Sequence, residues 1–306
     1  MKLHSKTIVI TGANGFVGSH LCRYFTEQGA NVRALVKQPE RCRALSAHAS
    51  GGMYRCQLPS DIDEKAFSGT VSLVVHCACE MKAGIRTANL EGTRRLLHLS
   101  QRADHFIFIS SLAAHSEAHS LYGQSKWEIE LEMQKANTTI IKPGTVIGNG
   151  GVFEKTRQLV RKSAILPLFY GGSRAIQTIW IGDLCRVIEN LCLGNSKGTY
   201  VAADFPGVSV RDYYRGISLL ENRHRWIVPF PGDFVLPFVQ LFERWHLPLP
   251  LSSDNLLGLK HLRSFAASKV GVNCLSYAQS LAALATEEGN FSAARRLECL
   301  RSNSLK

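Results

Sequence analysis

The sequence predicts an α/β fold, a doubly wound parallel sheet followed by a smaller C-terminal part. Residues 7–11 (TIVIT) form a short β-branched run, as expected for a strand buried on both faces, and apolar residues at 16–21 follow helical spacing. Similar strand-like runs alternate with helical stretches over the first 150 residues, a pattern typical of parallel sheets covered by helices. A chain of 306 residues, 45% of them hydrophobic, is long enough to bury such a core.

Three glycines mark the turn between the first strand and the first helix. Gly12 permits a tight turn, Gly15 lets the main chain approach a pyrophosphate, and Gly18 lets the helix pack close to the sheet. The unpaired amides of Gly15, Phe16 and Val17 would face phosphates at the positive end of the helix dipole. The strand before the glycines and the amphipathic helix after them therefore predict a dinucleotide-binding turn.

The remaining elements are expected from apolar runs and their spacing. Further strands are predicted at 31–36, 53–58, 71–77, 106–111, 138–141, 177–183 and 198–201, and helices at 152–163, 234–245 and 277–285. Asp183 is expected to cap the helix that follows it through its side-chain oxygen.

The end of the second strand decides between the two nicotinamide cofactors. An acidic residue there would hold the adenosine ribose hydroxyls of NAD, whereas a basic one suits the 2′-phosphate of NADP. The sequence has Arg33 and Lys37, with Arg41 and Arg43 beyond them, and no acidic residue before Glu40. We therefore expect NADP as the cofactor, with NAD as the alternative.

The glycine spacing is G-x-x-G-x-x-G, and later motifs follow in a familiar order. With TGANGFVGSHL near its start, the chain resembles the extended short-chain dehydrogenase/reductase family, the NAD-dependent epimerases and dehydratases. The later segments are 76–79 (HCAC) for H-x-A-A, 89–97 (NLEGTRRLL) for N-x-x-G-T-x-x-L-L, Tyr122 and Lys126 for Y-x-x-x-K, and 142–144 (KPG) for R-P-G. The resemblance implies a Rossmann cofactor domain in residues 1–145 plus about 175–203, and a substrate-binding cap in 146–174 and 204–306.

The resemblance also implies which residues contact the cofactor. They are Gly12, Gly15, Phe16, Val17, Gly18, Arg33, Lys37, Leu58, His76, Asn89, Tyr122, Lys126 and Pro143. Gln57 stands before Leu58 where the family often has an acidic residue for adenine, which is a departure from the pattern. We interpret His76 as a packed structural histidine near the nicotinamide side rather than as a catalyst.

Ser111, Tyr122 and Lys126 are the candidate catalytic residues. Tyr122 and Lys126 are four residues apart in a segment of helical character, so their side chains should share one face. An ammonium beside a phenol stabilises the phenolate, which would let Tyr122 act as an acid or base. Ser111 would hydrogen-bond the reacting oxygen, and the resemblance implies that Lys126 also binds the nicotinamide ribose.

The residues after Ser111 narrow the reaction. Dehydratases of the family place a polar, acidic pair there, where this chain has Leu112 and Ala113, so dehydration is disfavoured. We expect hydride transfer at a secondary alcohol or ketone carbon, giving an oxidoreductase or epimerase, with a nucleotide sugar as substrate. One alternative is a ketoreductase or hydroxysteroid-type dehydrogenase for a lipophilic substrate, favoured by the short loop between Ser111 and Tyr122. Another is a non-catalytic dinucleotide-binding subunit or sensor.

The charge and the cysteine content limit which other classes of partner the chain can have. The net charge of +12, from 36 basic and 24 acidic residues, favours an anionic substrate, and no nucleic-acid-binding module is visible. The predicted helix 152–163 carries four basic residues that would either clamp a diphosphate or form a solvated face. The nine cysteines are scattered like buried free thiols, Cys77 and Cys79 lack the partners of a metal site, and we expect a cytoplasmic protein without bound metal.

The stretch 228–251 is apolar and contains five prolines. It includes the predicted helix 234–245, and no apolar run in the chain reaches the roughly 18 residues of a membrane span. The helix would serve as the core of the cap, a lid over a lipophilic substrate, a peripheral membrane contact or a homodimer surface, and the sequence leaves these readings open.

Overall fold

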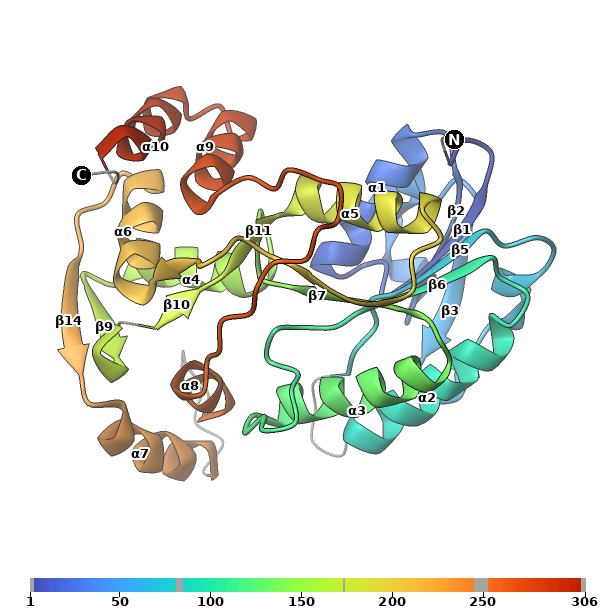
Figure 1. Ribbon diagram of the computed structural model, residues 1–306, viewed down its shortest axis with the longest axis horizontal. Helices are drawn as coiled ribbons and strands as arrows, with labels where there is room; N and C mark the ends of the chain where they lie inside the picture. The colour runs from blue at the N-terminus through green and yellow to red at the C-terminus, as the bar shows by residue number, and fades with distance from the viewer. Residues whose placement is uncertain (1–2, 81–84, 173, 245–252, 304–306) are drawn as a thin grey trace.

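The computed structural model describes residues 3–80, 85–172, 174–244 and 253–303. Its largest element is an eight-stranded sheet with the order β12-β7-β6-β5-β1-β2-β3-β4 (Figure 1). The strands are β1 (Thr7–Thr11), β2 (Asn31–Val36), β3 (Met53–Gln57), β4 (Asp61–Ile62), β5 (Leu73–His76), β6 (His105–Ile109), β7 (Thr139–Pro143) and β12 (Gly198–Ala202). Only the short β4 runs antiparallel to its neighbour, so the predicted parallel sheet is confirmed.

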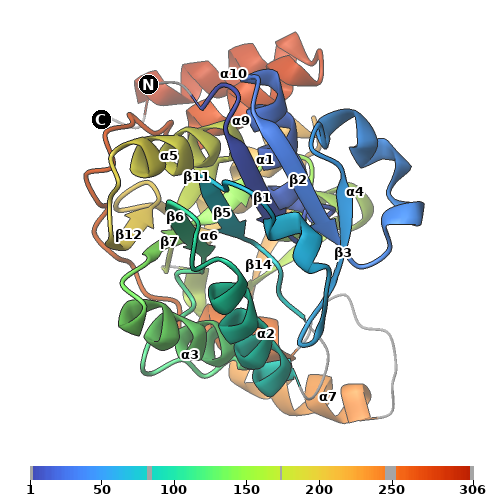
Figure 2. The same cartoon turned by 90° about the vertical axis from the view of Figure 1, so that its right-hand side faces the viewer.

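Helices cover both faces of this sheet, as Figure 2 shows from its edge. One face carries α1 (Phe16–Glu27) and α5 (Ile181–Leu193), and the other carries α2 (Ile85–Leu99) and α3 (Leu121–Lys135). A hydrophobic core lies on each face of the sheet, and successive residues of β1 point into them alternately. Ile8 and Ile10 pack in one core and Val9 packs in the other. The Tyr24 hydroxyl of α1 donates to the Glu189 carboxylate of α5 at 2.6 Å, which ties the two helices together.

The central strands read as continuous apolar runs because both of their faces are buried. Every residue of β5, β6 and β7 is buried, as a parallel strand between two helical layers requires. The predicted strand 106–111 begins and ends earlier than expected, since β6 covers His105–Ile109. The His105 ring pairs with the Thr139 hydroxyl of β7 at 2.9 Å, which keeps this polar residue in the sheet. Ser110 and Ser111 therefore lie just beyond the strand, at its carboxyl end.

A second part of the molecule, on the left of Figure 1, is built from short strand pairs and helices. Its pairs are β8 (Thr145–Ile147) with β11 (Thr178–Trp180), β9 (Ile165–Phe169) with β14 (Trp226–Phe230), and β10 (Ala175–Ile176) with β13 (Val208–Ser209). Its helices are α4 (Gly151–Lys162), α6 (Val210–Leu220), α7 (Gly232–Arg244), α8 (Ser253–Lys260), α9 (Tyr277–Glu287) and α10 (Phe291–Asn303).

The pair β9 and β14 was not expected from the sequence. Each strand contains a proline, Pro167 and Pro229, and proline removes a ladder hydrogen bond. A two-stranded ribbon tolerates them because each strand has a free edge. The predicted helix 234–245 corresponds to α7, while residue 245 and the rest of the proline-rich stretch up to 251 lie outside the described residues.

The expected role of Asp183 as a helix cap is wrong. Helix α5 begins two residues earlier, and its N-cap, Trp180, makes no side-chain cap bond. The fully buried Asp183 carboxylate instead accepts the Leu275 amide at 2.6 Å and pairs with Arg186. The residue is structural because it joins α5 to the chain that leads into α9.

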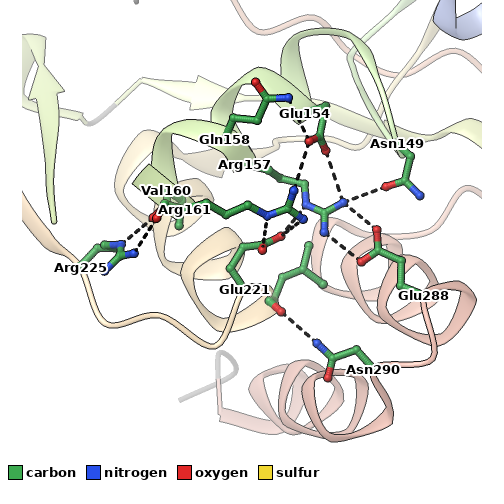
Figure 3. A network of polar contacts seen from close by, with 11 residues as sticks. Asn149, Glu154, Arg157, Gln158, Val160, Arg161, Glu221, Arg225, Glu288 and Asn290 are labelled. Atoms are coloured by element: carbon green, nitrogen blue, oxygen red, sulfur yellow. Dashed lines mark hydrogen bonds and ion pairs between the residues drawn. The ribbon is translucent and has the colours of Figure 1, made fainter. Parts of the chain in front are cut away.

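An ion-pair network centred on Arg157 joins three helices of the second part (Figure 3). The Arg157 side chain is 3% exposed, and its guanidinium donates to Glu221 at 2.6 Å and to both oxygens of Glu288 at 2.8 and 2.9 Å. Arg161, one turn along α4, donates to the same Glu221 carboxylate. Glu221 and Glu288 stand at the carboxyl ends of α6 and α9, where the helix dipole disfavours a lone negative charge. The arginines of α4 therefore neutralise these helix ends.

We expect Arg157→Met to lower the free energy of unfolding by about 3–5 kcal/mol, because it leaves partly buried carboxylates without their cation. The matched control is Arg161→Met, which removes the exposed partner of the same Glu221 and should cost less than about 1 kcal/mol. Urea unfolding of both variants measures the difference. Equal losses would show that the buried arginine does not hold the three helices together.

The same network predicts a dependence of stability on acid. Burial acts to raise the pKa of Glu221, but the hydrogen bonds from Arg161 and Arg157 prevail and lower it below its ordinary value of 4.5. The stabilisation is therefore complete above pH 4.5 and is lost as the pH falls through the lowered pKa. Glu221→Gln should flatten the fall of the melting temperature in that range, and a melting series between neutral and acid pH measures it. A slope equal to that of the unchanged chain would contradict this assignment.

Candidate active site

The turn after β1 has the geometry that a dinucleotide needs. Gly12 has φ +64°, and a Cβ there would lie 2.8 Å from the Ala78 amide nitrogen at the end of β5. A Cβ at Gly18 would lie 2.3 Å from the Gly12 carbonyl oxygen, so α1 passes too close to the turn for any side chain. The first amides of α1, at Phe16 and Val17, have no partner within the helix. The residues present thus fit a bound diphosphate at this helix end.

A second glycine-rich loop closes over the start of α1, and the sequence prediction missed its role. Cβ atoms at Gly148, Gly150 and Gly151 would lie 2.9, 2.4 and 3.0 Å from the Phe16 ring. The glycines therefore let the loop between β8 and α4 rest directly on that ring. The sequence signal for this contact was the run Gly-Asn-Gly-Gly at 148–151, which has more glycines than a turn alone would need.

The candidate catalytic residues lie at the carboxyl end of β6. Ser111 follows that strand directly, and its hydroxyl accepts the Ala113 amide at 3.2 Å. Lys126 is 3% exposed, its ammonium donates to the Ile109 carbonyl at 2.8 Å, and it stands 4.6 Å over the Phe108 ring. Tyr122 is half-buried, one helical turn before Lys126 on α3. The loop carrying Ser111 touches this turn, since a Cβ at Gly123 would lie 2.4 Å from the Ala113 carbonyl oxygen.

Asn89 connects the chain after β5 to helix α3 by hydrogen bonds. Its side-chain oxygen accepts the Glu80 amide at 2.8 Å, and its side-chain nitrogen donates to the Glu80 carbonyl at 3.1 Å and to the Ser125 hydroxyl at 3.3 Å. Asn89 is 1% exposed. It therefore fixes the strand end beside the glycine turn relative to the residue next to Lys126.

His76 is fully buried at the end of β5. One ring nitrogen pairs with the Thr11 hydroxyl at 2.8 Å and the other with the Thr93 hydroxyl at 3.0 Å. Burial, and then the charge of Lys126, lowers the pKa of His76 from 6.5 to about 3. The ring is neutral at any pH where the protein works, and both its nitrogens are engaged, so it supports the strand end rather than moving a proton.

The other residues that were expected to bind the cofactor are Lys37, Leu58, Pro143 and Arg33. Lys37 directly follows β2 and forms an ion pair with Glu80, and Pro143 ends β7, so both stand at the carboxyl edge of the sheet. Leu58 is buried after β3 and packs against Gly92 of α2. Arg33 is different, because its guanidinium donates to the carbonyls of Ala66 and Ser68 at 3.0 and 2.7 Å. The structure does not bring Arg33 to the glycine turn.

A buried charge cluster between α3 and β7 was not predicted from the sequence. The Glu130 carboxylate of α3, 1% exposed, accepts a hydrogen bond from Ser110 and pairs with the Lys142 ammonium of β7 at 3.0 Å. Lys142 also donates to the Ala114 carbonyl. Burial raises the pKa of Glu130, while Ser110 and Lys142 act in the opposite direction. The sequence signal was a third residue at helical spacing, since Tyr122, Lys126 and Glu130 are four apart.

A long-range pairing covers the loop between Ser111 and Tyr122. Residues 115–119 run antiparallel to residues 261–265, and their side chains meet at every second residue. The pairs are His119 stacked on His261 with ring centroids 3.8 Å apart, Glu117 with Arg263, and His115 with Phe265 at 6.4 Å. Beyond them, the Asp254 carboxylate of α8 accepts the Leu121 amide at 2.6 Å. Helix α8 and the chain after it therefore form a wall beside the Tyr122 end of α3.

His115 lies in this loop where the family motif has a tyrosine. Burial, and then the charge of Arg263, lowers the pKa of His115, so its ring is neutral near pH 7. Its buried Nδ1 has no hydrogen-bond partner among the described residues.

The glycine turn after β1 and the residues Tyr122 and Lys126 of α3 stand at one edge of the sheet, as expected for an enzyme that uses a nicotinamide nucleotide. The chain belongs to the NAD dependent epimerase/dehydratase family, whose model matches residues 8–186. The members to which the chain is similar include reductases and epimerases.

Three relatives illustrate the range. The chain is 27% identical over 255 residues to the ceramide reductase of Caulobacter vibrioides, covering 78% of each chain. It is 24% identical over 279 residues to the dTDP-4-dehydro-6-deoxy-D-allose reductase of Streptomyces bikiniensis, covering 74% of this chain and 85% of the relative. The UDP-glucuronic acid 4-epimerase of Bacillus cereus, solved in complex with NAD, matches with a TM-score of 0.62 at 19% identity, covering 74% of this chain and 87% of that one. This last likeness shows the fold alone.

Gly12→Ala tests the close approach at the glycine turn. The backbone strain of a positive φ costs about 1–2 kcal/mol for alanine, and here the Cβ also collides with the Ala78 backbone. We expect a larger loss of stability than strain alone explains, and weaker NADPH binding by at least about tenfold. Gly69→Ala is the control, because Gly69 has φ +71° and a Cβ there meets nothing within 4 Å. Thermal unfolding and cofactor fluorescence measure both effects, and equal effects in the two variants would refute the close-approach argument.

Proposed function

We propose that the chain catalyses hydride transfer at a secondary alcohol or ketone carbon. The observation that carries this proposal is the buried Lys126 ammonium at the carboxyl end of β6, one helical turn from Tyr122 and at the sheet edge that holds the glycine turn. A nicotinamide nucleotide bound along that edge supplies or accepts the hydride. The protein has to place the reacting carbon and to move one proton.

Tyr122 is proposed to move that proton. During reduction its hydroxyl donates to the carbonyl oxygen as the alcohol forms, and during oxidation the phenolate takes the proton back. Lys126 stands one helical turn along α3 on the same face as Tyr122, and we assign it to the ribose hydroxyls of the bound nucleotide. Ser111 holds the reacting oxygen by a hydrogen bond, and Asn89 keeps α3 in register with the strand end beside the glycine turn.

NADP remains our proposed cofactor within the NAD(P)-dependent family. Lys37 stands at the end of β2 where an acidic residue would favour NAD, and Arg41 and Arg43 follow in the next turns. Lys37 pairs with Glu80. A 2′-phosphate would have to draw Lys37 away from Glu80, so Arg41 and Arg43 become the stronger candidates, and Arg33 leaves the proposed set.

For the substrate we favour a lipophilic ketone or alcohol over the nucleotide sugar that the sequence favoured. The basic helix was the main argument for a diphosphate, and its buried Arg157 and its Arg161 are both engaged with glutamates. The ceramide reductase at 27% identity acts, by its name, on a lipid. Support also comes from α8, whose Leu256 packs in an apolar cluster with α7 and whose Asp254 accepts the Leu121 amide of α3. Both α7 and α8 belong to the proposed cap, residues 146–174 and 204–306.

A nucleotide sugar is the second candidate. Its support is the allose reductase relative, whose name describes a dTDP-linked sugar, together with the net charge of +12. In that case Lys155 and Lys162 of α4 would be the cations left to meet a diphosphate.

Tyr122→Phe is expected to lower turnover at least about a hundredfold, because general acid catalysis is worth roughly 10²–10⁴ in rate. NADPH should still bind, since the phenyl ring keeps the shape of the site. Tyr200→Phe is the matched control, because the Tyr200 hydroxyl, on β12, donates to the Lys197 carbonyl just before that strand. Turnover and cofactor affinity of both variants decide the matter, and full activity of Tyr122→Phe would exclude this mechanism.

The substrate class is tested by direct comparison. NADPH oxidation by the purified chain is followed with a long-chain aliphatic ketone in detergent micelles and with a dTDP-linked keto sugar. We expect at least about tenfold higher kcat/KM for the lipid, because a matching apolar pocket gains free energy with each buried methylene. A preference for the sugar would establish the second candidate.

A further inference from the structure

Helix α7 is apolar on the face that packs on the protein and also on the face turned to solvent. Its inner residues Val235, Leu236 and Val239 join a cluster with Phe169 and Leu256. On the outer side, Phe234 is 74% exposed, Phe238 62% and Leu241 44%. These three residues follow at spacings of four and three, so they form one stripe along the helix. An apolar stripe of this size on the solvent side of a helix normally packs against a partner.

The strand that leads into α7 continues this surface. In β14, Trp226, Val228 and Phe230 are exposed at every second position, and Ile165 of β9 is exposed directly beside Trp226. Strand β14 forms the outer edge of its two-stranded sheet and ends two residues before α7, at one corner of the molecule (Figure 1). We name Ile165 and the exposed residues of β14 and α7 the apolar corner. Exposed patches of this kind mark interaction sites.

Basic side chains stand at the beginning of β14. Arg225 donates to the carbonyls of Val160 and Arg161, and the Trp226 amide donates to the Ala164 carbonyl, so the end of α4 lies against this strand. The exposed Lys162 and Arg223 therefore flank the apolar corner. The chain as a whole carries a net charge of +12. An anionic surface is attracted by this charge, whereas a second copy of the same chain is repelled.

We propose that the apolar corner docks on an anionic lipid bilayer, with the stripe of α7 inserted among the acyl chains and the basic residues at the headgroups. Helix α7 has 13 residues, about 20 Å at the usual rise, which is too short for a hydrocarbon core of about 30 Å. Within the described part of the chain, no helix is long and apolar enough to span a membrane. The helix lies in the interface and does not cross it.

The docked surface connects to the candidate active site through α8. Leu256 of α8 packs against the inner face of α7, and Asp254 of the same helix accepts the Leu121 amide directly before Tyr122. A bilayer under α7 is therefore two helices away from the catalytic phenol. Docking needs no particular substrate, so it stands or falls separately from the proposed function.

Vesicle binding of the full chain tests this proposal. The purified protein is floated with phosphatidylcholine vesicles, with and without phosphatidylglycerol, at low and high salt. We expect binding to the anionic vesicles that weakens as salt screens the headgroup attraction. Phe234→Glu combined with Phe238→Glu should weaken partitioning by at least about tenfold, because two apolar side chains no longer enter the acyl region.

Two controls separate docking from general effects. Phe291→Glu changes an equally exposed phenylalanine on α10, away from α7 in Figure 1, and should leave vesicle binding unchanged. Lys162→Ala with Arg223→Ala should weaken binding to anionic vesicles and reduce its salt dependence. NADPH binding and melting temperature verify that each variant is folded.

Three results would overturn the proposal. They are no flotation with anionic vesicles, equal flotation of the double glutamate variant, and a wild-type dimer in light scattering that this variant converts to monomer without any vesicle binding. The last result would assign the apolar corner to a second copy of the chain.

Discussion

The ion pair between Glu130 and Lys142 determines where α3 lies on the sheet, and the candidate active site depends on that position. Both side chains are buried, and removing charges from water costs several kcal/mol per ion unless each is matched. Glu130 also accepts from Ser110, and Lys142 donates to the Ala114 carbonyl, so one cluster joins α3, the end of β6 and β7. Tyr122 and Lys126 lie on the same face of α3 as Glu130. Any shift of the helix that displaces the Tyr122 phenol would therefore also break this buried cluster.

The features of the fold that follow from local sequence were predicted well. The strands β1 and β2 have the bounds that their β-branched runs indicated, and Gly12 has the positive φ that a tight turn implies. Each of these features is decided by neighbours within a few residues. The same locality explains why Tyr122 and Lys126 could be placed one turn apart on a helix without knowledge of the rest of the fold.

The contacts that the sequence did not reveal concern side chains whose partners are distant in the sequence. Arg33, predicted to bind the cofactor, donates to carbonyls more than thirty residues away, and Asp183, predicted to cap a helix, accepts the Leu275 amide. The basic helix α4 gave no sign that Glu221 and Glu288 would contact it. A charged residue is attracted to whatever opposite group the fold brings near, so its sequence neighbours say little about its partner. The antiparallel pairing of 115–119 with 261–265 could not be predicted for the same reason.

These distant pairings bear on our proposal for the substrate. The guanidinium groups of Arg157 and Arg161 are engaged with glutamates at helix ends, so our proposal assigns substrate recognition to the apolar side chains of α7 and α8. Of these, α8 is held against the catalytic helix through Asp254 and against α7 through Leu256. Two contacts of one short helix thus link the inner face of α7 to the residue directly before Tyr122. The apolar surface of α7 and the candidate active site are therefore neighbours in the fold although more than a hundred residues separate them in the sequence.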